Sequence, residues 1–304
     1  MMDATVPAEP MPFRVLLDGA MKLTRRYFGT IYPSVAIPMA VITGVAAIAQ
    51  IRLMAGFMNE NAAAARSGNP AGAMYGGCAT FLVTMLASLL VHGITYAVLT
   101  SACVDGAASR PISMGAKWSF VLQPAVLGTL VLSFLAVAAG LVLLVLPGLY
   151  IGLMLSFVIP VMAAEGRRGS EALGRSWQLT RYNPQKRFLA NPATKIFVLY
   201  LVAGLITYAV SFIVQLPFTA MQGYRMARTI SSGQAANPQA MVGGILWWQI
   251  PSVILGSLVS TAVSVYSSFG LVLLYLDVVR RKEGGDLAAA IDARFPGAAP
   301  SPSA

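Results

Sequence analysis

The stretch QPAVLGTLVLSFLAVAAGLVLLVLPGLYIGLMLSFVIPVMAA, residues 123–164, consists of two apolar segments separated by Leu-Pro-Gly at 146–148. A helix needs about 20 apolar residues to cross a bilayer. Segment 123–146 has that length, and segment 149–164 is shorter. A proline–glycine pair is typical of a tight turn. The stretch therefore predicts two membrane spans that form a helical hairpin.

Four further apolar segments lie outside this stretch, which gives six predicted spans. They cover residues of about 31–52, 76–103, 194–216 and 251–277. The composition agrees, because 57% of the 304 residues are hydrophobic and only 11% are charged, against about 25% charged residues in soluble domains. We therefore expect an all-helical integral membrane protein, with one six-span domain over residues 1–295 and a disordered tail at 296–304.

Lysine and arginine are distributed unevenly over the connecting segments. The N-terminus, the 104–122 loop, the 165–193 loop with Lys195, and the C-terminal tail carry 4, 2, 7 and 4 of the 21 basic residues, or 17 in all. The positive-inside rule predicts that these segments are cytoplasmic. Both termini would then lie inside, and the protein would lie in the cytoplasmic (inner) membrane.

The net charge of +10 indicates anionic lipid headgroups as partners at this face. Nucleic acid is not an expected partner, because the arginines are not interleaved with aromatic residues in a base-stacking pattern. The candidate contacts to lipid, to a protein partner or within a homodimer are Arg25, Arg26, Arg167, Arg168, Arg175, Trp177, Arg181, Arg280, Arg281 and Lys282.

Three of the cytoplasmic segments, 12–29, 109–118 and 169–181, have an amphipathic pattern, and each precedes a pair of spans. This pattern is typical of helices that lie in the headgroup plane. The order of one such helix and two spans suggests a weak threefold repeat, although any six-span chain with a cytoplasmic N-terminus has three such segments. In the third segment, Glu171 and Arg175 are spaced for an ion pair along the helix.

Two rows of residues recur every four positions within the spans. A polar row in the second span includes Thr84, Ser88, His92 and Tyr96. It is either a track for a solute or lipid headgroup or a set of hydrogen bonds between helices, which we expect. A row of small residues in the sixth span comprises Ser252, Gly256, Ser260, Ser264 and Ser268. We expect it to pack against helices of the same chain, the alternative being a dimer face.

Several motifs resemble the membrane domain of glycerophosphoryl diester phosphodiesterases. They are VLLDGAMKLTRRYFGT (15–30), LPGLY (146–150), VIPVMAAEG (158–166), EALGRSWQLTR (171–181) and LLYLDVVRRKEGGDL (273–287). The chain departs from the family by lacking an arginine in GLMLSF (152–157) and by extra residues in YNPQKRFLANPA (182–193). The resemblance implies a stand-alone, multi-span helical domain without the catalytic barrel that carries the phosphodiesterase activity.

The chain offers no catalytic constellation. It has one histidine, His92, and its eleven acidic residues lie at or outside the ends of the spans. We therefore expect no enzyme activity, no metal and no cofactor. The first functional hypothesis is a membrane scaffold or a module that interacts with lipid or a partner. The alternatives are a permease or exporter of a small or amphiphilic solute that uses the His92 face, and a membrane-embedded enzyme.

Overall fold

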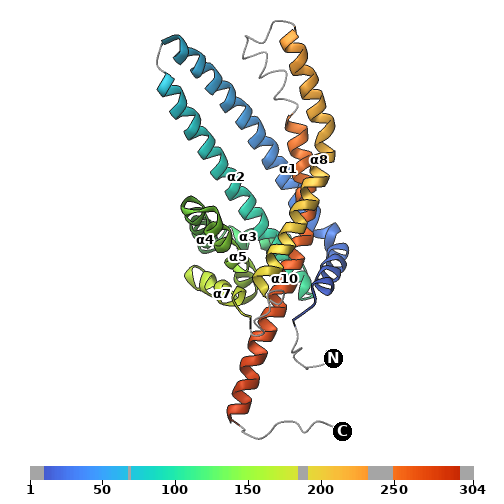
Figure 1. Cartoon of the computed structure of the whole chain (residues 1–304). Coiled ribbons are helices and arrows are strands. Elements are labelled where there is room, and N and C mark those ends of the chain that lie inside the picture. Colours follow the sequence, from blue (N-terminus) through green and yellow to red (C-terminus); the bar gives the residue numbers. More distant parts are fainter. Residues whose placement is uncertain (1–9, 68–69, 184–190, 232–248, 295–304) are drawn as a thin grey trace. The chain divides into compact units, whose positions relative to one another are not determined.

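The computed structural model describes residues 10–67, 70–183, 191–231 and 249–294, and the regular elements in these ranges are all helices (Figure 1). Side chains are described for these residues except at 54–55, 57–87, 89, 142, 229 and 285–294. The predicted tail 296–304 lies outside the described residues.

Six helical stretches in these ranges are long and apolar enough to cross a membrane. They are Phe13–Leu53, Leu90–Ala107, Pro124–Leu141, Val145–Glu165, Pro192–Arg228 and Gln249–Gly284. They follow the six predicted spans in number and order. The prediction of an all-helical, multi-pass membrane protein is therefore confirmed.

Four of the described helices are longer than a membrane requires. They are α1 (Phe13–Ser67), α2 (Pro70–Ala107), α8 (Pro192–Ser231) and α10 (Gln249–Arg294). With its 55 residues, α1 has a length of about 80 Å at 1.5 Å per residue, against about 30 Å for the hydrocarbon core of a bilayer. These helices therefore continue beyond the segment that hydropathy alone assigns to the membrane.

The three predicted interfacial segments have different outcomes. Segment 12–29 forms the first part of α1 and is continuous with the first span. Segment 109–118 is replaced by a short helix that begins later, α3 (Met114–Val121), and segment 169–181 corresponds closely to α7 (Ser170–Thr180).

The helices group into two compact units, which are described separately. Unit 1 comprises residues 1–27, 100–202 and 266–304, and unit 2 comprises residues 28–99 and 203–265. The interpretation as one six-span domain stays a prediction.

In unit 1, α4 (Pro124–Leu143) packs against α5 (Val145–Met154), which confirms the predicted hairpin (Figure 1). The turn, however, is not at Leu-Pro-Gly. Only Leu144, with an extended backbone, separates the two helices, and Pro147 and Gly148 lie in the first turn of α5. Proline is tolerated there because the first N–H groups of a helix need no intrahelical acceptor.

Gly148 allows the two helices of the hairpin to approach at backbone distance. A Cβ atom at Gly148 would lie 2.6 Å from the backbone nitrogen of Leu141, and a Cβ at Gly140 would lie 2.9 Å from the Cα of Gly148. The glycine of the Leu-Pro-Gly sequence is thus needed for close packing.

The tip of the hairpin is apolar and exposed. Leu143 and Leu146 expose 77% and 78% of their surface, and the two residues between them are also exposed. The sequence has no charged residue from 124 to 164, so no polar loop joins α4 to α5.

The fourth span is interrupted at residues 155–157, between α5 and α6 (Val158–Glu165). An interruption leaves carbonyl groups at the end of a helix without regular helical donors. Here α7 supplies a donor, because the buried hydroxyl of Ser176 donates to the carbonyl oxygen of Met154 at 2.8 Å. The single hydrogen of the Thr180 hydroxyl has two acceptors within reach, the carbonyl oxygen of Ser176 at 2.9 Å and that of Met154 at 3.2 Å. The short amphipathic helix therefore stabilises a break in an apolar span.

Unit 2 consists of segments of α1, α2, α8 and α10. The hydroxyl of Tyr32 in α1 donates to the carbonyl oxygen of Leu258 in α10 at 3.3 Å. Thr95 Oγ1 in α2 lies 3.4 Å from Met39 Sδ in α1. Large apolar side chains such as Val45, which is 62% exposed, lie on the outside, as expected for a surface that contacts lipid.

Candidate functional site

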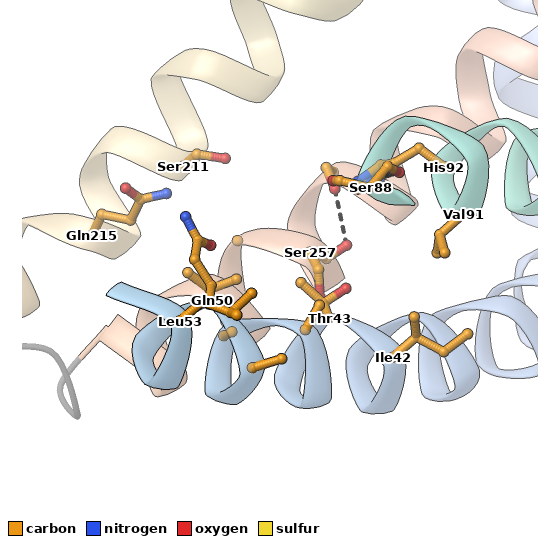
Figure 2. Close-up of a pocket in the computed structure, with 16 residues that line it drawn as sticks. Ile42, Thr43, Gln50, Leu53, Ser88, Val91, His92, Ser211, Gln215 and Ser257 are labelled. Carbon is orange, nitrogen blue, oxygen red and sulfur yellow. Dashed lines mark hydrogen bonds between the residues drawn. The ribbon is translucent and has the colours of Figure 1, made fainter. Parts of the chain in front are cut away.

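Unit 2 contains a partly open cavity of about 600 Å³ between its four helical segments (Figure 2). The polar residues that line it are Thr43, Gln50, Ser88, His92, Ser211, Gln215, Ser257 and Ser260. Most of the remaining lining is apolar, and no Asp, Glu, Lys or Arg is among the described residues around it. Both the size and the mixed lining are typical of sites for small molecules, which occupy about 300–1,000 Å³.

His92 lies on the wall of this cavity and comes from α2 (Figure 2). Its Nδ1 lies 2.8 Å from the carbonyl oxygen of Ser88. Because a carbonyl can only accept, we assign the hydrogen to Nδ1, which donates to it. In the neutral ring Nε2 is then a hydrogen-bond acceptor.

Two carboxamides also line the cavity, Gln50 from α1 and Gln215 from α8 (Figure 2). Gly256 leaves room for the second, since a Cβ atom at Gly256 would lie 3.3 Å from Nε2 of Gln215. Each carboxamide offers both donors and an acceptor. Neither glutamine was predicted from the sequence. The available signal was an isolated amide within an apolar segment, where a polar group is costly and often functional.

A smaller cavity of about 380 Å³ adjoins the first one in unit 2. His92 and Ser260 line both cavities. The other polar residues around the smaller cavity are Thr95, Tyr96, Thr261 and Ser264. His92 and Ser260 therefore lie at the boundary between the two cavities.

The structure brings the described part of the predicted polar row to these cavities. Ser88 and His92 line the larger cavity, and His92 and Tyr96 line the smaller one. The side chain of Thr84 lies outside the described residues. The hydrogen bond between His92 and Ser88 is within α2, whereas a bond between helices was expected. Both interpretations of the row, the solute track and the packing between helices, stay predictions.

The predicted stripe of small residues divides between cavity lining and packing. Gly256 and Ser260 line the larger cavity, and Ser264 lines the smaller one. Ser268 is buried in unit 1 and hydrogen-bonded to α2, and Ser252 is half-buried.

In unit 1, Glu165 at the end of α6 is the centre of a polar cluster. Arg175 Nε in α7 donates to both carboxylate oxygens at 3.1 Å, and the hydroxyl of Tyr275 in α10 donates to Oε1 at 2.9 Å. Arg175 Nη2 also donates to Glu283 at 2.7 Å. The cluster therefore connects α6, α7 and α10.

Arg175 takes these partners in place of Glu171, the partner expected from helical spacing. Burial by itself lowers the pKa of the Arg175 guanidinium, but the hydrogen bonds and charges of Glu165 and Glu283 outweigh it, so that the pKa is raised above its ordinary value. Arg175 therefore remains charged in the folded protein.

A second charged group in unit 1 surrounds Asp277, which accepts a hydrogen bond from Arg281 Nη2 at 2.8 Å. The side chains of these two residues are 4% and 7% exposed. Nearby, Lys195 Nζ donates to the carbonyl oxygen of Met11 at 2.7 Å. The prediction of Arg281 as a surface contact is therefore wrong, although its spacing of four residues from Asp277 in the sequence is a signal for this pair.

The other candidate contacts of unit 1 lie nearer the surface. Trp177 is half-buried, with the edge of its ring against Tyr150 at a centroid distance of 5.8 Å, and Lys282 is also half-buried. The exposed candidates are Arg25, Arg26, Arg167, Arg168, Arg181 and Arg280.

Comparison of the chain with protein-family models, with curated proteins and with solved structures finds no match. Among the described residues, no group of three or more His, Cys, Asp or Glu is arranged to hold a metal ion.

Proposed function

We propose that this multi-pass membrane protein binds a neutral amphiphilic molecule in the cavities of unit 2 and acts as a permease or exporter for it. The observation that carries the proposal is the cavity of about 600 Å³, whose lining combines apolar side chains with uncharged polar groups. The apolar part of the lining suits an aliphatic chain, and the polar part suits a polar end group.

The absence of a fixed charge from the described lining favours a neutral ligand. An ion in such surroundings would lose its hydration without gaining a counter-ion. A membrane site for a charged solute normally supplies an ionisable partner. The family resemblance is compatible with a lipid-derived ligand, and membership of that family is part of the proposal.

Photolabelling tests the binding step. The full chain in phosphatidylcholine nanodiscs is irradiated with a diazirine-bearing oleoylglycerol, and the labelled peptides are mapped by mass spectrometry. We expect label on the residues around the cavity and its suppression by unlabelled oleoylglycerol. Labelling spread evenly over the lipid-facing surface would contradict the proposal.

A matched pair of variants in α1 sharpens this test. Ala46 lines the cavity, so Ala46→Trp should fill it and abolish the label. Val45 is the adjacent residue, lies outside the lining and faces outward, so Val45→Trp should leave the label unchanged. Transport is measured as transfer of the probe between the leaflets of proteoliposomes. If the cavity is labelled but the probe does not move between the leaflets any faster, the protein binds lipid without transporting it.

The scaffold hypothesis remains a second candidate, because six of the predicted contact arginines, all in unit 1, are exposed. Exposed arginines attract anionic headgroups by about 1 kcal/mol each. Joint replacement of Arg167 and Arg168 by alanine should then remove a stabilisation of the protein by phosphatidylglycerol, measured against phosphatidylcholine at low salt. An unchanged difference between the two lipids would count against this candidate.

The cytoplasmic orientation is also part of the proposal. It is supported by the charge distribution, because the described lysines and arginines of the four basic segments belong to unit 1. In a cysteine-free background, Arg168→Cys should react with an impermeant maleimide only after cells are permeabilised. Arg228→Cys, which lies on the opposite side in this topology, should react in intact cells. The reverse pattern would invert the topology.

A further inference from the structure

Three of the hydroxyl groups that line the larger cavity donate their hydrogens to their own helices. Ser257 Oγ donates to the carbonyl oxygen of Ile254 at 2.7 Å, and Ser260 Oγ donates to that of Ser257 at 3.0 Å. Thr43 donates in the same way to Met39. A hydroxyl has one hydrogen, so these oxygens can meet a ligand only as acceptors.

His92 follows the same rule. The hydrogen on Nδ1 is donated to Ser88, which leaves Nε2 as an acceptor in the neutral ring. Thr43, His92, Ser257 and Ser260, which come from α1, α2 and α10, therefore all offer acceptors to the cavity, and we call these four residues the acceptor wall; Figure 2 shows the first three.

We propose that the acceptor wall selects molecules whose polar end carries hydroxyl groups over molecules of the same shape whose polar end can only accept. The proposal rests on the proposed function, since it specifies which neutral amphiphiles the cavity takes. A ligand hydroxyl that lies against the acceptor wall donates to one of its lone pairs, whereas an ether oxygen in the same place cannot, and has to find a donor elsewhere in the lining, such as the carboxamides of Gln50 and Gln215. An ammonium group would also donate, but it would bring a charge to a lining whose described residues include no carboxylate.

The expected difference in affinity between the two kinds of ligand follows from the known behaviour of polar binding sites. A site built to hydrogen-bond a hydroxyl rejects the analogue that lacks it much more strongly than an apolar pocket rejects a change of one methylene. We therefore expect at least about a tenfold difference in affinity between the two kinds of ligand.

The experiment compares two probes with the same chain. 1-Oleoylglycerol carries two free hydroxyls, and its 2,3-dimethyl ether carries none. Each displaces the photolabel from the full chain in nanodiscs, and the two half-displacing concentrations are compared. The wild type should prefer the diol by about tenfold or more.

Variants then locate the preference. His92→Phe and Ser260→Ala each remove one acceptor, so each should weaken binding of the diol and leave binding of the diether unchanged. His92→Gln restores an acceptor and should recover part of the preference. Ser252→Ala is the matched control, because Ser252 lies in the same helix, donates to its own helix in the same way and lies outside the lining of both cavities.

The outcomes separate this inference from the proposed function. Equal binding of diol and diether overturns the inference and leaves the proposed function intact. A preference that survives both His92→Phe and Ser260→Ala also overturns it, because the wall would not be the selector. If neither probe displaces the label, the proposed function fails and the inference with it. Ser260→Ala changes little volume, so it decides the question even where His92→Phe folds poorly.

Discussion

Replacement of Gly148 by alanine should force the α4–α5 hairpin apart. The added Cβ would lie 2.5 Å from Cγ of Leu141 and 2.6 Å from its backbone nitrogen. The leucine side chain can adopt another rotamer, but the backbone nitrogen cannot move without its helix. Overpacking of this kind costs about 1–3 kcal/mol, and alanine regains about 1 kcal/mol over glycine within a helix. We expect a net loss of up to about 2 kcal/mol in the free energy of unfolding.

Gly152 provides the control in the same helix. A Cβ atom there would meet its nearest neighbour, a methyl group of Val137, at 3.9 Å, which is an ordinary contact. Gly152→Ala should therefore be neutral or stabilise the protein by up to about 1 kcal/mol. Two identical substitutions, four residues apart in α5, are thus expected to have opposite signs.

The comparison is made by reversible unfolding in mixed micelles, with sodium dodecyl sulfate as the denaturant and tryptophan fluorescence as the signal. Equal free energies of unfolding for Gly148→Ala and Gly152→Ala would refute the reasoning, because the close approach of α4 and α5 would then play no part in the folded hairpin.

Three further predictions concern unit 1 and use the same unfolding assay. Arg175→Ala should lower the free energy of unfolding by about 1.5–3 kcal/mol, because hydrogen bonds to two carboxylates are lost, whereas Arg181→Ala, at an exposed position, should stay within about 0.5 kcal/mol. Because folding raises the pKa of Arg175, its contribution to the free energy of unfolding is complete below the pKa of the unfolded state. This contribution is lost only when the pH rises through the still higher pKa of the folded state. The difference between wild type and Arg175→Ala should therefore be constant from about pH 7 to 10, and a steady decline over this range would contradict the ion-pair account. Ser176→Ala should cost about 1 kcal/mol, and the double variant with Thr180→Ala should cost more than the sum of the two single variants, because the hydrogen of Thr180, which has the carbonyl oxygens of both Ser176 and Met154 within reach, can replace the donor that Ser176→Ala removes; strict additivity would exclude a shared acceptor.

The spans could be predicted because each depends on a local property, a run of apolar residues of sufficient length. The ends of the long helices could not be predicted in the same way. Nothing in hydropathy distinguishes a helix that stops at the membrane surface from one that continues through polar residues, as α1 does up to Ser67. The predicted turn at Pro147 and Gly148 is wrong, because the close packing of Gly148 against α4 determines the backbone there more than the turn preference of a Pro-Gly pair does.

Which carboxylate pairs with Arg175 depends on the backbone conformation between α6 and α7, and the spacing of charged residues in the sequence does not reveal that conformation. Gly166 and Gly169 have φ angles of 71° and 60°, in the left-handed region that glycine adopts without strain. These two residues turn the chain between α6 and α7, and Glu165 then faces Arg175 more closely than Glu171 does along the helix.

The candidate site was predicted only in part for a similar reason. The recurrence of Ser88, His92 and Tyr96 defines one face of a helix from sequence alone. Whether that face packs or lines a cavity is decided by residues of other helices, such as Gln215 in α8 and Gly256 in α10. Because Gln215 and Gly256 are far from His92 along the chain, a repeat pattern within one helix cannot predict that the three residues lie around the same cavity.

The apolar tip of the α4–α5 hairpin has a consequence for the biogenesis of the protein. Because one residue, Leu144, connects the two helices, and because the sequence has no charge from 124 to 164, no hydrophilic segment has to be carried across the hydrocarbon during insertion. The two helices can enter the bilayer together, from the side on which the start of α4 and the end of α5 remain. Insertion of the hairpin then depends on total hydrophobicity and is insensitive to the membrane potential, which acts only on translocated charges.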